Sequence, residues 1–218
     1  AGAQRYEELA ASVRHSLSAA LADRSVPELA FRDRENAHKW LFEMSRRLEN
    51  RIPDRQQRLE LLRTAHFEAL RAGLDPQLVL GLMQVESGFR KYAVSSAGAR
   101  GYMQVMPFWS RVIGDGDASR LFHMQTNLRF GCVILRHLLD RENGDLFMGL
   151  GRYNGSRGQA AYPRAVLAAQ EDNDESYTIE LDPIVVVASK RQQSLSSIAA
   201  QVTVIDARQI QELMVEDI

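Results

Sequence analysis

Residues 75–107 read DPQLVLGLMQVESGFRKYAVSSAGARGYMQVMP, and this stretch decides the fold. It opens with Asp75 and Pro76, an N-cap acid followed by a proline at the first helical position. The helix predicted over residues 77–87 is apolar nearly all round, so we expect it to be central and buried. Gly88 is a suitable residue to end that helix.

The segments on either side of this stretch repeat apolar residues at helical spacing. Further helices are predicted over residues 6–21, 40–52, 54–73, 126–140, 145–153 and 157–169, with another that begins near residue 107. Asp54 and Asp145 are the expected N-caps of two of these helices. The sequence therefore predicts a mostly α fold.

The last part of the chain has a different composition. Residues 1–170 carry a net charge of +6 and residues 171–218 a net charge of −7, which gives the overall charge of −1. Residues 171–181 are predicted to form an acidic linker. Beyond it, strands are predicted over residues 184–187 and 202–205, followed by a capped helix over residues 206–213.

Several classes of protein find no support in the composition. Cys132 is the only cysteine and lies in a helical pattern, so we expect a buried, inert thiol, no disulfide and no cysteine metal site. The five histidines are scattered, so no metal site is predicted. The arginines are dispersed along helices, which indicates solvated faces and no nucleic-acid partner. Neither a transmembrane run nor a signal peptide is visible in the sequence.

Glu86 is the candidate for acid–base chemistry. It shares a helical face with Leu82, Met83 and Phe89, and its place in the last turn puts an anion against the helix dipole. Both effects disfavour the ionised carboxyl and raise its pKa. The simpler alternative is a surface glutamate paired with Arg90 at i+4, and Glu86 taken alone favours that alternative.

Three motifs around Glu86 favour the acid–base role over the ion pair with Arg90. They are ESGF at residues 86–89, GARGYMQVMP at residues 98–107 and YNG at residues 153–155. In this order and spacing they resemble the SLT catalytic domain of the family 1 lytic transglycosylases, whose relatives in fold are the goose-type lysozymes. The resemblance implies a lysozyme-like helical catalytic domain over residues 55–170, with residues 1–54 as an N-terminal helical extension.

The resemblance also implies roles for the matching residues. Glu86 would be the sole catalytic acid and base, and Ser87 would help orient the reacting sugar. Met103 and Gln104 would line the cleft, and the Gln104 amide offers both a donor and an acceptor to N-acetyl groups. Tyr102 stands where the family usually has leucine and would add sugar contacts. Met103 reads equally well as a core residue.

The third motif implies two further contacts. Tyr153 would hydrogen-bond the catalytic carboxyl, and Asn154 would hold the loop that follows it; the alternative for Tyr153 is a core aromatic residue. Arg152 departs from the family, which usually has alanine there, and this puts the packing of the loop in doubt.

The implied reaction uses one carboxyl, whereas ordinary glycosidases use two. The nearby Asp115 and Asp117 are expected to be turn and cap residues. The resemblance implies cleavage of the MurNAc–GlcNAc bond of peptidoglycan in the bacterial periplasm, with no cofactor, leaving 1,6-anhydroMurNAc ends. A goose-type lysozyme hydrolase and a non-catalytic peptidoglycan-binding protein remain as alternatives.

The tail carries a second resemblance. Residues 182–195, DPIVVVASKRQQSL, and residues 202–210, VTVIDARQI, resemble the TonB box and the start of the plug domain of a TonB-dependent receptor. The rest of the plug and the barrel are not found in the sequence, so we expect no transport by this chain. The resemblance implies that residues 182–190 bind TonB as an added strand. The alternatives are a tail without a role and a fused reading frame.

Overall fold

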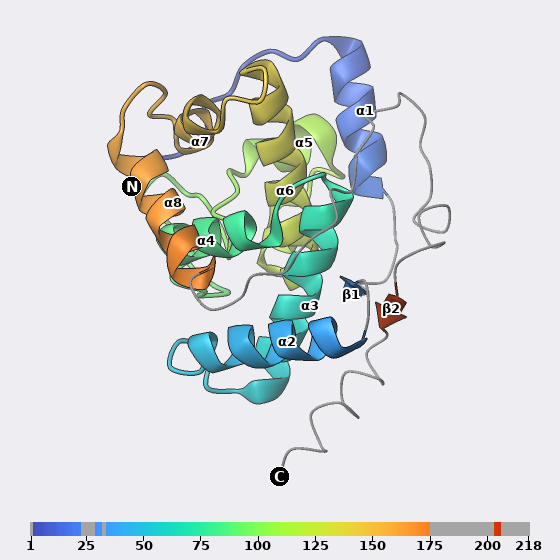
Figure 1. The fold of residues 1–218 in the computed structure, drawn as a ribbon. Helices are drawn as coiled ribbons and strands as arrows, with labels where there is room; N and C mark the ends of the chain where they lie inside the picture. Colours follow the sequence, from blue (N-terminus) through green and yellow to red (C-terminus); the bar gives the residue numbers. More distant parts are fainter. Residues whose placement is uncertain (1, 23–28, 32–33, 175–202, 206–218) are drawn as a thin grey trace.

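The computed structural model describes residues 2–22, 29–31, 34–174 and 203–205, and this part of the chain is mostly helical, as predicted (Figure 1). The helices are α1 (Ala11–Ala22), α2 (Arg34–Leu48), α3 (Arg55–Arg71), α4 (Pro76–Ser87), α5 (Phe108–Ile113), the 3-10 helix η1 (Ala118–Phe122), α6 (Met124–Arg141), α7 (Leu146–Asn154) and α8 (Ala161–Asp174). None of these helices is both long enough and apolar enough to cross a membrane.

The predicted helix caps are confirmed. Asp54, Asp75 and Asp145 each accept a backbone N–H from the first turn of their helix, at 2.6, 2.9 and 2.9 Å. Each bond satisfies a donor that the helix itself leaves without a partner. Gly88 ends α4 in the left-handed conformation, with φ of 57°. Local chemistry thus fixes where these helices begin and where α4 ends.

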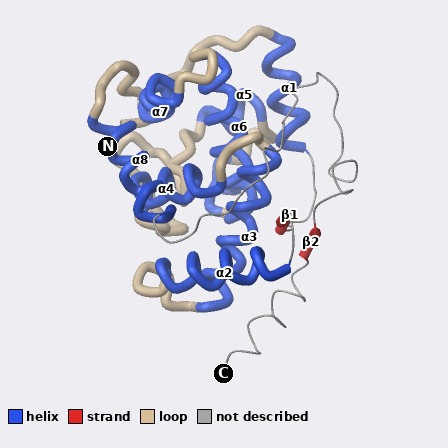
Figure 2. The backbone as a smooth tube through the Cα atoms, viewed as in Figure 1, coloured by secondary structure: helices blue, strands red, loops and turns tan. Residues whose placement is uncertain are grey.

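Helix α4 is central, as its apolar sequence predicts. Leu80, Leu82 and Met83 are almost completely buried. Helix α8 packs along α4, while α6 packs against both α3 and α7 (Figure 1). Between α4 and α5 the chain is loop (Figure 2), joined across itself by isolated bridges from Arg100 to Val94 and to Val105. This loop carries the second motif.

The structure corrects several predicted boundaries. Helix α2 spans Arg34–Leu48, whereas the sequence predicts a helix over residues 40–52. Residues 6–9 are not helical, because α1 begins only at Ala11 and residues 2–10 have no regular structure. The side chains of Gln4 and Glu7 in this segment contact distant parts of the domain. At the other end α8 runs to Asp174, so the first residues of the predicted acidic linker are helical.

A short pairing links two distant segments. Strand β1 (Leu29–Phe31) pairs antiparallel with β2 (Thr203–Ile205), with Leu29 opposite Ile205. Strand β2 lies inside the strand predicted over residues 202–205. The predicted strand over residues 184–187, the predicted helix over residues 206–213 and the TonB-box segment 182–190 lie outside the described residues.

Candidate active site

Glu86 lies in the last turn of α4 and is partly buried. The hydroxyl of Tyr162, in the first turn of α8, donates a hydrogen bond to Glu86 Oε1 at 2.5 Å. Burial raises the pKa of Glu86 from 4.5 to about 7, and the hydrogen bond from Tyr162 opposes that rise. Near neutral pH this carboxyl is therefore present in both protonated and ionised forms, as a group that acts as acid and then as base requires.

The alternative reading of Glu86 as half of a surface ion pair does not fit the structure. The Arg90 guanidinium donates from Nε to the carbonyl of Ser87 at 2.9 Å. An i+4 pair needs the helix to continue, but α4 ends at Ser87. Gly88 and Phe89 both have positive φ, 57° and 62°, and the chain turns sharply there. This turn separates Arg90 from the helical face that carries Glu86.

The packing of α4 against α8 positions Tyr162. A Cβ atom on Gly81 would lie 2.8 Å from the backbone N of Gln170 and 2.9 Å from the carbonyl O of Val166, so only glycine permits this approach. Gln170, near the end of α8, donates to Asp75 at the start of α4, and Tyr162, at the start of α8, donates to Glu86 at the end of α4. The two helices therefore run antiparallel. Sequence reasoning missed Tyr162. Tyr162 lies outside the three motifs, so no direct signal for it is present in the sequence.

Three buried side chains form hydrogen bonds with the backbone of the second motif. Ser87 Oγ donates to the carbonyl of Tyr102 at 2.7 Å, and Tyr153 Oη donates to the carbonyl of Met103 at 2.7 Å. Asn127 of α6 accepts the N–H of Met103 at 2.8 Å and donates to the carbonyls of Arg100 and Leu121. All three side chains are at least 99% buried. We name them the motif clamp; sequence reasoning missed Asn127.

The structure corrects four expected contacts, those of Tyr153, Met103, Tyr102 and Ser87. Tyr153 does not hydrogen-bond Glu86, because its hydroxyl is directed to Met103 and Tyr162 takes that place. Met103 is fully buried, and a Cβ on Gly131 would lie 2.3 Å from its sulfur, so it fills the core. Tyr102 is also fully buried and accepts a hydrogen bond from Gln57 at 3.3 Å. Tyr102 and Met103 therefore have no free surface to offer a sugar, and neither does Ser87.

Of the two remaining predicted site residues, Gln104 is buried and Asn154 is partly buried. Gln104 adopts a left-handed backbone with φ of 50°, and its Nε2 donates to the carbonyls of Ala93 and Gly101 at 3.1 and 3.0 Å. Its donor is therefore already used within the loop. Asn154 is partly buried and donates to Ser156 Oγ at 2.9 Å, which holds the loop that follows α7.

The arginine that departs from the family pattern leaves this loop intact. Arg152 forms ion pairs with Glu142 and Glu7. Glu142 also pairs with Arg157, and the hydrogen bonds from Arg157 and Arg152 lower the Glu142 pKa to about 2. The added charge is thus neutralised at the surface.

The other carboxylates near this region have structural roles. Asp117 accepts the N–H of Ser119 at the start of η1, and Asp115 accepts the N–H of Asp117 and pairs with Arg120. Both are turn and cap residues, as predicted. Within the described residues, no three of the side chains that commonly bind metals lie together.

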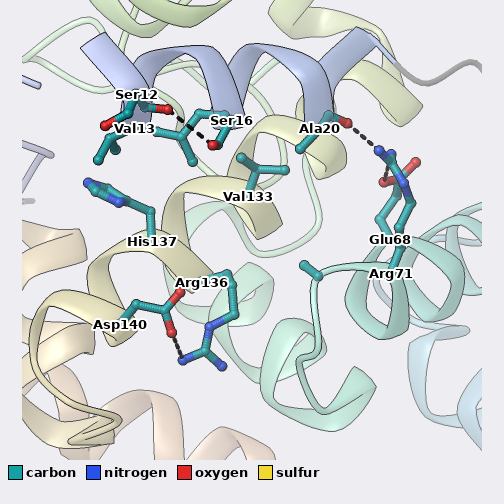
Figure 3. Close-up of a pocket in the computed structure, with 12 residues that line it drawn as sticks. Ser12, Val13, Ser16, Ala20, Glu68, Arg71, Val133, Arg136, His137 and Asp140 are labelled. Carbon is teal, nitrogen blue, oxygen red and sulfur yellow. Dashed lines mark hydrogen bonds and ion pairs between the residues drawn. The ribbon is translucent and has the colours of Figure 1, made fainter. Parts of the chain in front are cut away.

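A separate cavity of about 430 Å³ lies between α1 and the pair α3 and α6 (Figure 3). Its charged side chains pair with one another: Arg71 with Glu68, and Arg136 with Asp140. No residue of the three motifs lines it. Cys132, on α6, is fully buried, which raises the pKa of its thiol and fits the predicted inert role.

The comparisons with known proteins identify the family. The transglycosylase SLT domain family matches residues 63–176, so the chain belongs to this family. It is 41% identical over 80 residues to membrane-bound lytic murein transglycosylase C of Actinobacillus pleuropneumoniae, covering 33% of this chain and 22% of that protein. Over 101 residues it is 41% identical to the protein of that name from Histophilus somni, covering 42% and 27%.

Two further relatives extend the comparison. The transglycosylase of Enterobacteria phage PRD1 is 38% identical over 87 residues, covering 40% of this chain and 31% of that protein. A solved structure of an inactive mutant of lytic transglycosylase Slt from Pseudomonas aeruginosa superposes with a TM-score of 0.48 at 17% identity, covering 79% of this chain and 38% of that chain. The chain spans less than a third of the length of the curated relatives it matches.

Proposed function

We propose that this chain is a peptidoglycan lytic transglycosylase of the cell envelope, acting in the periplasm, with Glu86 as its single catalytic acid and base. One observation carries the proposal: Glu86, which lies in the first of the three motifs, has a pKa of about 7 and accepts a hydrogen bond from Tyr162. The chain around it belongs to the SLT family. Membership of that family and the names of the relatives support the choice of substrate.

The proposed reaction needs only one carboxyl. Protonated Glu86 donates its proton to the oxygen that bridges N-acetylmuramic acid and N-acetylglucosamine, and the bond from that oxygen to C1 breaks. The ionised Glu86 then removes the proton from the C6 hydroxyl of the muramic acid, whose oxygen bonds to C1. The product is a 1,6-anhydroMurNAc end, Glu86 is protonated again, and no water is consumed.

The environment of Glu86 suits both halves of this cycle. Burial stabilises the neutral acid before bond cleavage, and the Tyr162 hydroxyl stabilises the carboxylate that follows. A lysozyme-type hydrolase would use the same acid but activate a water. Asp115 and Asp117, the carboxylates that follow the second motif, are engaged in turns, which favours the route with one carboxyl.

The decisive experiment is mass spectrometry of purified sacculi digested with the wild type and with Glu86→Gln. We expect anhydro-muropeptides from the wild type and a loss of turnover in the variant, with binding to sacculi retained. Reducing ends in place of anhydro ends would identify a hydrolase. Equal product release by both proteins would remove Glu86 from the mechanism, and the absence of products from the wild type would favour the binding protein.

The tail adds a separate proposal. The TonB-box resemblance of residues 182–190 supports docking to TonB by strand addition. Binding of a purified TonB periplasmic domain to the full chain, with Val186→Pro as the variant, tests it. Proline removes a backbone donor from the added strand, so we expect that variant to bind less tightly. Equal binding by both chains would contradict the docking role.

A further inference from the structure

An extended segment, residues 2–7, lies against the second motif. The side chain of Gln4 is 95% buried, and its carboxamide makes two hydrogen bonds a hundred residues away along the chain. Nε2 donates to the carbonyl of Gln104 at 3.1 Å, and Oε1 accepts the N–H of Met106 at 2.9 Å. Gln4 therefore bonds two backbone groups of the second motif, the carbonyl of Gln104 and the N–H of Met106, which the clamp does not bond.

The same segment also contacts the third motif. A Cβ on Gly155 would lie 2.2 Å from the carbonyl O of Ala3, and a Cβ on Gly2 would lie 2.1 Å from the carbonyl O of Asn154. Figure 1 shows the start of the chain beside α7 and α8, and α8 carries Tyr162, the partner of Glu86. Residues 2–7 thus extend from the loop after α7 to the second motif.

We propose that residues 2–7 form an autoinhibitory strap, which a glycan strand must displace before it reaches Glu86. This inference rests on the proposed function, because the two motifs that the strap joins are those expected to border the glycan cleft. While the strap is in place, the N–H of Met106 and the carbonyl of Gln104 are not available to the N-acetyl and hydroxyl groups of a sugar.

The contacts of the strap are few enough to be reversible. Residues 2–10 belong to no helix or strand, so displacement breaks no regular structure. Beyond the two bonds of Gln4, the side chain of Tyr6 meets Phe108 edge-on at 5.6 Å and is 58% exposed. Glu7 forms partly exposed ion pairs with Arg141 and Arg152, and such pairs contribute little.

A strap of this kind competes with substrate, so it changes KM and leaves kcat unaltered. The apparent affinity for glycan falls by the fraction of molecules in which the cleft is open. Gln4→Leu removes both hydrogen bonds at nearly constant side-chain volume, so the open fraction rises. We expect KM for soluble, uncrosslinked glycan strands to fall by about tenfold.

The matched control is Glu8→Gln, at an exposed position directly after the strap, which should leave both constants unchanged. An unaltered or raised KM for Gln4→Leu would overturn the proposal, since a raised value means that Gln4 helps to bind glycan. If thermal melting shows that Gln4→Leu does not fold, the variant that combines Tyr6→Ala with Glu7→Gln decides, because it removes the aromatic contact and both ion pairs of the strap. A smaller fall in KM is expected for it, and an unchanged KM would overturn the proposal.

A binding measurement separates this inference from the proposed function. In the Glu86→Gln background, Gln4→Leu should tighten the Kd for the same glycan strands by about tenfold, whether or not the wild type shows turnover. A synthetic peptide of residues 2–8, GAQRYEE, should weaken that binding competitively, while the same peptide with leucine at the third position should not. An unchanged Kd together with no peptide competition would refute the strap even in an active enzyme.

Discussion

The carboxyl of Glu86 should make the folded protein less stable as it ionises. Its pKa is about 7 in the folded protein and 4.5 ordinarily, so the folded state binds more protons than the unfolded state between these values. The stability that this group contributes is fully present below pH 4.5 and is lost as the pH rises through 7. Glu86→Gln carries a neutral group of the same shape at every pH.

The expected magnitude follows from the shift. A difference of this size corresponds to about 3 kcal/mol for a fully buried group, and partial exposure of Glu86 reduces it to about 1–2 kcal/mol. Glu86→Gln should therefore unfold at the same temperature as the wild type near pH 4. Above pH 7 it should unfold a few degrees higher, at roughly 2–4 °C per kcal/mol.

The assay is thermal unfolding of both proteins from pH 4 to pH 9, beside turnover on sacculi. Glu49→Gln, at an exposed position after α2, is the control and should show no such gap. A gap that stays constant with pH, or that closes above pH 7, would refute the reasoning about burial. We thus expect Glu86→Gln to lose turnover and to gain thermal stability above pH 7, and the two assays measure these effects on the same variant.

Three other substitutions test the supports of the site. Tyr162→Phe removes a donor that favours the carboxylate, so turnover should fall by roughly tenfold and the alkaline limb of kcat/KM should move to higher pH; an unmoved limb would deny that role. Gly81→Ala should cost about 1–3 kcal/mol in urea unfolding and lower turnover, because it forces α4 from α8; unchanged values would contradict the close packing. His66 is buried and its pKa is lowered to about 3, so the stability that it contributes is present above pH 6.5 and is lost as the pH falls toward 3, by up to about 5 kcal/mol. His66→Phe should flatten this acid limb in chemical denaturation, and an equally steep limb would show that other groups cause it.

Features with local causes could be predicted from the sequence. Asp75 with Pro76, and Gly88 at the far end, fixed the bounds of α4 because a cap needs only neighbours in the chain. The prediction of a raised pKa for Glu86 also needed only the face of one helix. The motifs then indicated the family, which the match over residues 63–176 confirms.

Contacts between distant segments could not be predicted in this way. Tyr162 reaches Glu86 only because Gly81 allows two helices to meet, and Asn127 reaches the motif loop from another helix. The helix predicted over residues 6–21 is found as α1, but its predicted first residues, 6–10, are not helical. In this part of the chain the side chains of Gln4 and Glu7 bond to distant parts of the fold, and such bonds leave no periodic trace in the sequence.

The motif clamp has a consequence for how this family is read from sequence. Tyr102, Met103 and Tyr153 are buried. These residues of the family motifs therefore support the loop of the second motif from the interior of the protein. Two proteins that share these residues can therefore prefer different glycans. A library that varies Met106 and Asn154, both partly exposed beside the loop, should alter preference among glycans, whereas the same variation in the clamp should yield mostly unfolded chains.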